Sequence, residues 1–386
     1  MAWGDTDVVE QRLRLVIAAS RGERSVTALC REFEISRQTG YRWLNRYRAG
    51  GSSEVVERSR RPLHSPQRTA PEVELAVVEL RRRYPDWGAP KLLVLLGREH
   101  PEWKVCERTV HRILVRQGLL VDADRHRPAV ERFERGAPNE LWQMDFKGPP
   151  GFNGASPVGP LSVLDDHSRY LVTLRQLGST GAAGVKQTLE CAFETAGVPD
   201  AMLVDHGTPW WDAASPWGIT GLAIWIARQG VRLLHSGFRH PQTQGKVERL
   251  HGALARAVRR RGADLLDQDW LDLFRHEYNH VRPHAALGMI TPAERWSQSA
   301  RLYQAEPHEW AYAPAAEVRR LSGQGQLQWR GRRWEISRSL CGQVVGIETV
   351  GERALVYFCN APVRELDLRT NVTRSIPGDL LGSLHD

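Results

Sequence analysis

The sequence predicts a multidomain protein with two α-helical helix-turn-helix units at its N-terminus, a central α/β domain and a small β-barrel at its C-terminus. Three observations lead to this prediction. Apolar residues recur at helical spacing between residues 8 and 121, strands and helices alternate between 139 and 300, and short alternating runs fill 315–370. A chain of 386 residues is long enough for each part to bury its own core.

The composition indicates a folded protein with a polyanionic partner. A hydrophobic fraction of 41% and a charged fraction of 25% are ordinary globular values, which excludes bulk disorder. The net charge is +8, and residues 1–64 already hold 12 Lys and Arg against 8 Asp and Glu. Because the surplus is concentrated in the first third, this part is expected to contact nucleic acid. The alternative is a basic surface that only keeps the protein soluble.

Cysteine usage and hydropathy bear on the compartment. The five cysteines are scattered and never paired at C-x-x-C spacing, so neither a disulfide framework nor a zinc finger is indicated. The sequence has no run of about 18 apolar residues, and its first residues lack a signal-peptide pattern. We therefore expect a cytoplasmic protein.

The first helix-turn-helix unit is predicted within residues 1–50. A helix over 8–20 is followed by a short helix that Ser25 or Thr27 opens, a turn at 34–36, and a second helix over 37–47. Residues at the start of such a second helix face the major groove of DNA. The alternative is a helical hairpin that contacts no DNA. The candidate DNA-binding residues are Arg37, Gln38, Thr39 and Arg42.

A polar linker over 51–70 leads to a second helix-turn-helix-like domain over 71–121, and a charged linker follows over 122–138. Breaks at Gly88, Pro101 and Gly118 separate helices expected at 71–84, 89–99 and 106–117. A purely structural helical bundle stays open as the alternative. The candidate DNA-binding residues on the last helix are Arg108, Thr109 and Arg112, with His111 between them.

The central domain is predicted over 139–300, where the period changes from helical to strand-like. The expected strands are LWQMDF, two strands joined by a turn at 166–169, AMLVD and VRLLHS; the expected helices cover GAAGVKQTLECAFETAG, 217–229, the segment with Glu248, and 268–281. Such alternation is typical of an α/β domain. Asp165 and Asp166 are expected to form the strand turn, with a supporting role in a metal site as the alternative.

The C-terminal part, 315–370, is predicted to be a small β-barrel or meander. Its runs are LQWRGRRWEI with a turn at Arg330 and Gly331, QVVGIETV, RALVYFC and PVRELDL. Four arginines are expected to be exposed, where they contact DNA or protect a sheet edge by charge: Arg330, Arg332, Arg333 and Arg338.

Three acids are candidates for catalysis. Asp145 lies in a strand, Asp205 ends one, and Glu248 lies beside the apolar stripe of a helix that begins in HPQTQGKVERLHG. Ligands of open α/β sheets bind at the carboxyl ends of strands, so the two aspartates can converge. Three carboxylates together repel one another unless a cation joins them, and Mg²⁺ prefers oxygen ligands. Lys246 and Arg249 on the same helix are candidate phosphate contacts.

The motifs LWQMDF, LVDHGTPWW, HPQTQGKVERLHG and EYNHVRPHAAL...TPAERW together resemble the integrase-like catalytic core of DDE transposases. With helix-turn-helix modules before the core, the chain is similar to bacterial insertion-sequence transposases. The resemblance implies an RNase H-like fold and a metal-binding triad of Asp145, Asp205 and Glu248 that holds two Mg²⁺ ions, with Mn²⁺ able to substitute. It implies supporting roles for His206, which stands where the family commonly has Asn, and for Asn279, Arg282 and His284.

The implied activity is that of a polynucleotidyl transferase. Such an enzyme binds the terminal inverted repeats, nicks the DNA ends by metal-dependent hydrolysis and joins the freed 3′-OH to target DNA, as a homodimer or higher homo-oligomer near the nucleoid. Two alternatives stay open: a catalytically inactive DNA-binding regulator, and a metal-dependent nuclease without strand transfer.

Overall fold

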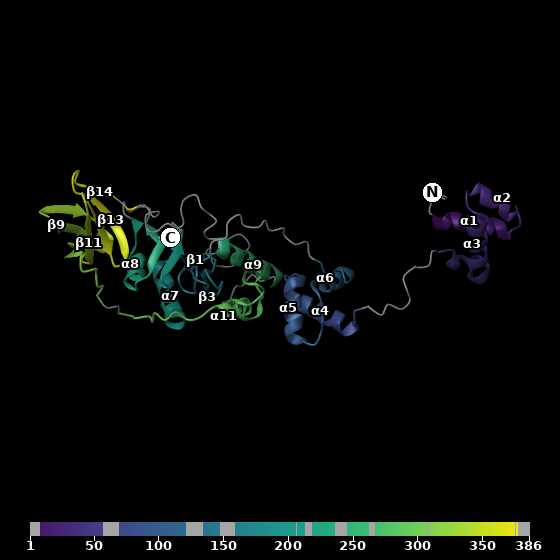
Figure 1. The fold of residues 1–386 in the computed structure, drawn as a ribbon, viewed down its shortest axis with the longest axis horizontal. Coiled ribbons are helices and arrows are strands. Elements are labelled where there is room, and N and C mark those ends of the chain that lie inside the picture. The colour runs from purple at the N-terminus through teal and green to yellow at the C-terminus, as the bar shows by residue number, and fades with distance from the viewer. Residues whose placement is uncertain are drawn as a thin grey trace. The chain divides into compact units, whose positions relative to one another are not determined.

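The structure is a computed structural model. It describes residues 8–56, 69–120, 134–146, 159–205, 207–212, 218–235, 245–261, 267–306, 309–374 and 376. The chain divides into two compact units, Met1–Thr69 and Ala70–Asp386, and Figure 1 labels their elements in chain order. The predicted residue His206 and the predicted linker over 122–138, except its last residues, lie outside the described residues.

The first unit is helical. Its elements are α1 (Val8–Ser20), α2 (Val26–Glu32), α3 (Arg37–Gly50) and the 3₁₀ helix η1 (Gly51–Val55). Serine hydroxyls cap the N-termini of α2 and α3. Ser25 accepts the N–H of Ala28, and Ser36 accepts the N–H of Thr39 at 3.1 Å. The predicted helix-turn-helix is therefore confirmed in outline, with α3 three residues longer than expected.

The turn between α2 and α3 needs a left-handed residue and a close helix approach. Glu34 has φ 50°, a conformation that glycine adopts without strain and most other residues do not. Gly40 is buried in α3, and a Cβ there would lie 2.3 Å from the sulfur of Cys30 on α2. Gly40 thus allows the second helix to pack directly on the first.

Replacing Glu34 with glycine is expected to stabilise the first unit by about 0.5–1 kcal/mol, because the left-handed conformation no longer strains a side chain. Chemical denaturation of the wild type and the variant measures this. The exposed neighbour Glu32 supplies the control Glu32→Gly, which should destabilise by a similar amount because it lies within helix α2. Loss of stability in Glu34→Gly would contradict the proposed strain.

The second helical domain resembles the first in its pattern of buried and exposed residues. It consists of α4 (Pro71–Arg83), α5 (Ala89–Glu99) and α6 (Glu107–Arg116), packed around Val77, Leu92 and Ile113. The last helix of each domain follows the same succession of exposed and buried positions, with Thr39 matching Thr109. Both helices therefore expose the same face.

A mixed five-stranded sheet forms the central domain. The strands are β1 (Trp142–Phe146), β2 (Leu161–Asp165), β3 (Leu171–Arg175), β4 (Ala201–Val204) and β7 (Arg232–His235), in the order β3-β2-β1-β4-β7. β1, β2 and β3 pair antiparallel, and β4 runs parallel to both β1 and β7. An integrase-like mixed sheet, as the resemblance implied, is therefore present.

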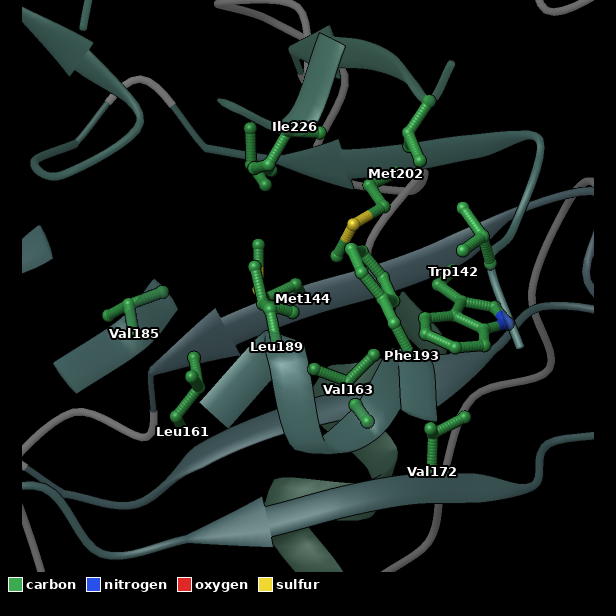
Figure 2. Packing of buried hydrophobic residues seen from close by; sticks show 14 of the residues in the cluster. Trp142, Met144, Leu161, Val163, Val172, Val185, Leu189, Phe193, Met202 and Ile226 are labelled. Carbon is green, nitrogen blue, oxygen red and sulfur yellow. The ribbon is translucent and has the colours of Figure 1, made fainter. Parts of the chain in front are cut away.

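Helices cover both faces of this sheet. On one face, α7 (Ala182–Ala196) and α8 (Gly221–Arg228) pack against alternate residues of the strands. Figure 2 shows Met144, Phe193 and Met202 projecting into this shared core. On the other face, α9 (Gly245–Arg261) and α10 (Gln268–His276) pack against Leu164 and Leu171. The strand alternation that predicted the sheet thus separates two apolar layers.

The end of the central domain departs from a regular helix. The helix expected over 268–281 consists of α10 and a π-helical turn, η3 (Glu277–Val281), closed by the N–H of Arg282 on the carbonyl of Glu277 at 2.9 Å. The 3₁₀ turn η4 (Ala285–Leu287) and α11 (Pro292–Arg295) follow. β5 (Trp211–Asp212) and β6 (Gly218–Ile219) form a separate ribbon. Wide π turns occur often at functional sites.

The C-terminal part is an open antiparallel sheet, and the predicted barrel is not confirmed. β8 (Glu317–Arg320), β11 (Val344–Val350), β12 (Arg353–Phe358), β13 (Ala361–Asp367) and β14 (Val372–Arg374) are ordered β14-β13-β12-β11-β8. β9 (Gln326–Trp329) and β10 (Arg332–Glu335) form a separate hairpin, and η5 (Arg338–Leu340) follows. The hairpin packs on the sheet through Trp329 and Trp334 without closing it by hydrogen bonds.

Candidate active site

Asp145 lies on the face of β1 that looks toward α9. Its neighbours Trp142 and Met144 point into the core beneath α7 and α8, so alternation turns Asp145 to the opposite face. About a quarter of its side chain, 26%, is exposed. This carboxylate is therefore held by the sheet and still reachable by a ligand.

Asp205 follows the last residue of the neighbouring strand β4. Trp142 pairs with Met202 and Gln143 with Leu203, so the same register continued along both strands places Asp145 beside Asp205. Neighbouring strands lie about 4.8 Å apart, and paired residues of parallel strands face the same side. The two predicted aspartates thus come from adjacent strand ends on one face of the sheet.

Gly207 is a residue of this site that the sequence motifs did not single out. Its N–H donates to Oδ1 of Asp205 at 3.0 Å. A Cβ at position 207 would lie 3.1 Å from both carboxylate oxygens of Asp205. A side chain there would press on the carboxylate, so glycine after the second acid leaves room for it. The spacing D-x-G was the signal that could have indicated this.

Glu248 lies in the first turn of α9, between two residues that anchor the helix. Val247 and Leu250 are buried, whereas Glu248 is exposed. Helix α9 packs against β1 and β2, the strands that carry Asp145 and its partner Ser162. The helix therefore holds Glu248 at the margin of its buried stripe, as its position beside Val247 predicted.

A buried ion pair fixes the start of α9. Lys246 lies two residues before Glu248, and its Nζ contacts Oδ1 of Asp166 at 2.6 Å and donates to the carbonyl of Asp166 at 2.9 Å. Only 11% of the Lys246 side chain and none of Asp166 is exposed. Burial lowers the pKa of Lys246 to about 8, while the charge of Asp166 acts to raise it. Lys246 thus ties α9 to the end of β2.

This pairing corrects the prediction that Lys246 contacts DNA, because its ammonium group is directed into the protein. Arg249, its predicted companion, is exposed on α9, and its DNA contact stays a prediction. Helical spacing could not separate the two, since it gives only the position of a side chain around the helix and not a partner from a distant strand.

The turn between β2 and β3 is built by its two acids, as predicted. Asp165 is fully buried and accepts the N–H and the hydroxyl of Ser168 and the N–H of Asn139. Burial raises the pKa of Asp165, against the opposing effect of these hydrogen bonds. Asp166 accepts hydrogen bonds from the Gln143 side chain and the Arg135 backbone in addition to Lys246. Both acids are therefore occupied inside the fold.

His251 joins Asp145 to the neighbouring strand and was not predicted. Its Nε2 lies 2.7 Å from the hydroxyl of Ser162, and its Nδ1 lies 3.7 Å from Oδ2 of Asp145. Ser162 pairs with Asp145 across β1 and β2 and donates to the Asp145 carbonyl at 3.1 Å. Ser162, His251 and Asp145 form a chain of contacts like that of a serine hydrolase, but Ser162 is fully buried and His251 nearly so. The arrangement therefore positions Asp145 and leaves no room for a substrate at the serine.

The donor set suits a hard divalent cation, but the three acids are not assembled around one point. Three carboxylates supply only oxygen ligands, which Mg²⁺ prefers. Within the described residues, no group of three or more His, Cys, Asp and Glu side chains lies close enough together to hold a metal ion. The structure thus brings the three elements together and does not bring the three carboxylates to coordination distance.

Of the predicted supporting residues, Asn279 braces the sheet edge. It is buried in the π turn, where its Oδ1 accepts the N–H of Leu171 at 2.8 Å and its Nδ2 donates to the carbonyl of Leu171 at 2.9 Å. Arg282 and His284 follow the π turn and are partly buried. Burial lowers the pKa of His284 to about 3, helped by the charges of Arg282 and Lys91.

The predicted DNA-contacting side chains of both helix-turn-helix domains lie mostly on open faces. Arg37, Gln38 and Arg42 are exposed on α3, and Arg108, His111 and Arg112 are exposed on α6. The two predicted threonines are partly buried. The Thr39 hydroxyl hydrogen-bonds with that of Ser36, and the Thr109 hydroxyl hydrogen-bonds with the sulfur of Cys106, each near the start of its helix. In the C-terminal hairpin and turn, the four predicted arginines are all exposed.

Three family models match parts of the chain. A helix-turn-helix domain matches residues 11–62, a homeodomain-like domain matches 39–114, and an integrase core domain matches 229–292. The last match includes Glu248 and the π turn, and the two aspartates lie outside it. The integrase core match thus covers the later part of the central domain.

Curated relatives come from insertion elements. The uncharacterized protein of insertion element IS407 from Burkholderia multivorans is 27% identical over 255 residues, which are 62% of this chain and 83% of the relative. The uncharacterized protein of insertion element IS476 from Xanthomonas euvesicatoria is 27% identical over 233 residues, 56% of this chain and 62% of the relative. The resemblance to insertion-sequence transposases with helix-turn-helix modules and an integrase-like core is confirmed.

Two solved structures are distant likenesses. One is the simian T-cell lymphotropic virus intasome in complex with PP2A regulatory subunit B56 gamma, with 14% identity and a TM-score of 0.37 over 78% of this chain and 99% of that chain. The other is the HTLV-2 integrase catalytic core domain in complex with magnesium in its trimeric form, with 14% identity and a TM-score of 0.32 over 42% and 97%.

The integrase core and the insertion-element relatives support a transposase or integrase type of function, in the class of polynucleotidyl transferases. The helix-turn-helix matches support binding to DNA. In the part of the chain that the structure describes, none of the helices combines the length and the apolar character required to span a membrane.

Proposed function

We propose that the protein is a transposase that binds the terminal inverted repeats of its element, nicks the DNA ends and joins the freed 3′-OH to target DNA. The observation that carries this proposal is the parallel pairing of β1 with β4, because its register, continued by two residues, would set Asp145 next to Asp205 on the face of the sheet that α9 covers. Glu248 on α9 supplies the third carboxylate. All three lie in a chain with an integrase core and helix-turn-helix domains.

Asp145, Asp205 and Glu248 would hold the metal, proposed as two Mg²⁺ ions with Mn²⁺ able to substitute. Bound divalent ions supply Lewis acidity, which activates the attacking water or 3′-OH and stabilises the leaving oxygen. The chain's own residues prepare this site: His251 and Ser162 fix the Asp145 strand, and Lys246 with Asp166 fixes the first turn of α9. Arg37, Gln38 and Arg42 on α3, with Arg108 and Arg112 on α6, would bind the repeats.

A second candidate is a DNA-binding regulator of transposition with an inactive core. One observation favours it: the three carboxylates are not within reach of a shared ion in the described residues. We prefer the transposase, because Asp145 is partly exposed and Asp205 and Glu248 are exposed, so all three carboxylates are open to a ligand. A regulator would not require any of these acids.

The two candidates are separated by incubating the full chain with duplex DNA that carries the inverted repeats flanking its coding sequence. With Mg²⁺ or Mn²⁺ we expect nicked ends and then products joined to a target duplex, and with EDTA we expect binding without either product. Binding without cutting in the presence of either metal would establish the regulator. Cutting without joined products would establish a nuclease.

The proposed enzyme acts as a homodimer or higher homo-oligomer, because two transposon ends must be joined in one complex. Assembly on DNA is measured by light scattering of the protein with and without the repeat duplex. Subunits that stay monomeric on two repeat duplexes while joined products form would contradict this part of the proposal.

A further inference from the structure

Among the residues that the structure describes, three cations on three separate elements have no partner of opposite charge. Lys91 lies in the first turn of α5, Arg256 lies on α9, and Arg282 follows the π turn. All three are partly buried. Within the described residues, no hydrogen bond or ion pair joins any of the three side chains to another group. By contrast, Lys246, the other partly buried lysine of this region, has its carboxylate.

The charges of Arg282 and Arg256 both act on Lys91. The pKa of Lys91 is lowered to about 7. Burial is the largest cause, and the charges of Arg282 and Arg256 contribute to the same shift. Burial is also the main cause of the lowered pKa of Arg282, with Arg256 acting in the same direction. Tyr278, Glu277 and Asp86 act on the pKa of Arg282 in the opposite direction. Like charges kept together in a partly buried place destabilise the free protein.

Aromatic rings and a helix end set the shape of this place. The Arg282 guanidinium lies 5.9 Å from the ring centre of Trp87, which precedes α5, and 6.0 Å from that of Tyr278 in the π turn. α5 begins after Gly88, which offers no capping side chain, and its first turn has no acid. The positive end of the α5 dipole therefore adds to the charge of Lys91.

Packing holds the two sides of the cationic cluster together. Val281 packs against the core of the second helical domain. Arg98 near the end of α5 pairs with Glu294 on α11 at 3.1 Å. The buried Nε2 of His284, near Lys91, also lacks a hydrogen-bond partner in the described part of the chain. The cationic cluster of Lys91, Arg256 and Arg282 thus lies between packed elements, and the described part of the chain supplies no anion to pair with it.

We propose that Lys91, Arg256 and Arg282 form a binding site for a backbone phosphate of DNA, at the junction of the second helical domain and helix α9. This inference rests on the proposed function and adds a specific contact to it. Arg256 lies eight residues after Glu248 on the same helix, which is about 12 Å along its axis. A DNA strand held at the cationic cluster therefore reaches the proposed catalytic acids from the side of the second helix-turn-helix domain.

DNA is the occupant that this chemistry favours over a free phosphate ion. The cluster lies between a helix-turn-helix domain and the helix with Glu248, and both are elements that a DNA strand must contact in the proposed function. Arg and Lys together hold phosphates by charge and by directed hydrogen bonds. Trp87 and Tyr278 hold Arg282 in place, which reduces the entropy lost when it binds.

The test measures binding of the full chain to the repeat duplex in EDTA, at several salt concentrations. Lys91→Met and Arg256→Gln are each expected to weaken binding roughly tenfold or more and to reduce the slope of log K against log salt by about 0.9. Lys186→Met is the matched control: Lys186 is partly exposed on α7, far in sequence from the proposed site, and pairs with Glu190 at 3.4 Å. Its replacement should leave both quantities unchanged.

Two further measurements separate binding from folding. The thermal midpoint of the free protein should stay level or rise in Lys91→Met, because the mutation removes a repelling charge. Replacing single backbone phosphates of the duplex by neutral methylphosphonates should weaken the wild type at one position and leave Lys91→Met unaffected there. A lowered midpoint with an unchanged salt slope would overturn the proposal and leave Lys91 a structural residue.

The outcomes distinguish this inference from the proposed function. Variants that bind like the wild type, while the wild type cuts and joins DNA, overturn the phosphate site alone. A second outcome is a wild type that never cuts, while one neutral phosphate weakens its binding and leaves the binding of Lys91→Met unchanged. That result would support the phosphate site and refute the transposase. Inorganic phosphate is the remaining probe: stabilisation of the wild type by it, with duplex binding independent of Lys91, would exclude DNA as the occupant.

Discussion

Replacing Asp145 with asparagine is expected to lower the rates of DNA nicking and strand transfer by about 10³-fold, because a metal ligand is worth several kcal/mol of transition-state stabilisation. Asp205→Asn and Glu248→Gln should have effects of the same order. Asparagine keeps the shape of the side chain and the strand pairing with Ser162, so the fold should be unchanged. Steady-state product formation with Mg²⁺ measures the effect.

DNA affinity gives the control for this experiment. Each variant removes a negative charge, so binding to the repeat duplex in EDTA should stay level or become tighter. Asp269→Asn is the matched variant, since Asp269 is exposed on α10 and lies outside the proposed site. It should cut and join like the wild type. If Asp145→Asn retained wild-type rates, the carboxylate triad would be wrong even if the protein proved to be a transposase.

Replacing Lys246 with methionine is expected to destabilise the central domain by about 3 kcal/mol, because it leaves the fully buried Asp166 without its cation. This is the lower end of the range for a broken buried pair, since Asp166 keeps its hydrogen bonds from Gln143 and Arg135. Catalysis should fall as well, because α9 loses the contact that fixes its first turn, two residues before Glu248. Chemical denaturation and product formation measure the two effects.

The double variant Lys246→Met/Asp166→Asn tests the cause. Removing both charges eliminates the unpaired buried carboxylate, so most of the lost stability should return. A more exposed lysine gives the comparison: 45% of the Lys186 side chain is exposed, and Lys186→Met breaks its pair with Glu190 on α7, which should cost less than about 0.5 kcal/mol. Equal losses in the single and double variants would show that the methionine itself is not tolerated.

Much of the fold followed from local patterns in the sequence. Helices α1, α4 and α5 begin and end within one residue of the predicted bounds. Helix-breaking residues such as Gly88 act locally, so they set the end of a helix regardless of its tertiary surroundings. The hairpin turn at Arg330 and Gly331 was also predicted, and both residues have the positive φ of a tight turn. The barrel was not confirmed, because alternation predicts strands and does not predict whether the first and last of them pair.

The candidate site was predictable in its acids and not in its supports. Asp145, Asp205 and Glu248 stand in motifs whose context is local, and the rule that ligands bind at the carboxyl ends of strands was enough to expect the two aspartates to converge. The partner of Lys246 lies 80 residues away in the chain, and Ser162 lies 89 residues from His251. No periodicity relates such distant positions. Lys246 was therefore predicted to contact DNA, whereas the structure shows it in a buried ion pair with Asp166.

The sequence by itself determined which segments form helices and strands, which faces are apolar and which acids stand at the ends of strands, since each depends on residues within a few positions of one another. Only the tertiary structure decided which charges are neutralised inside the protein and which are not. Lys246 has a carboxylate, whereas Lys91 is under the influence of the like charges of Arg256 and Arg282, because charge pairing depends on distances that chain folding sets between remote residues.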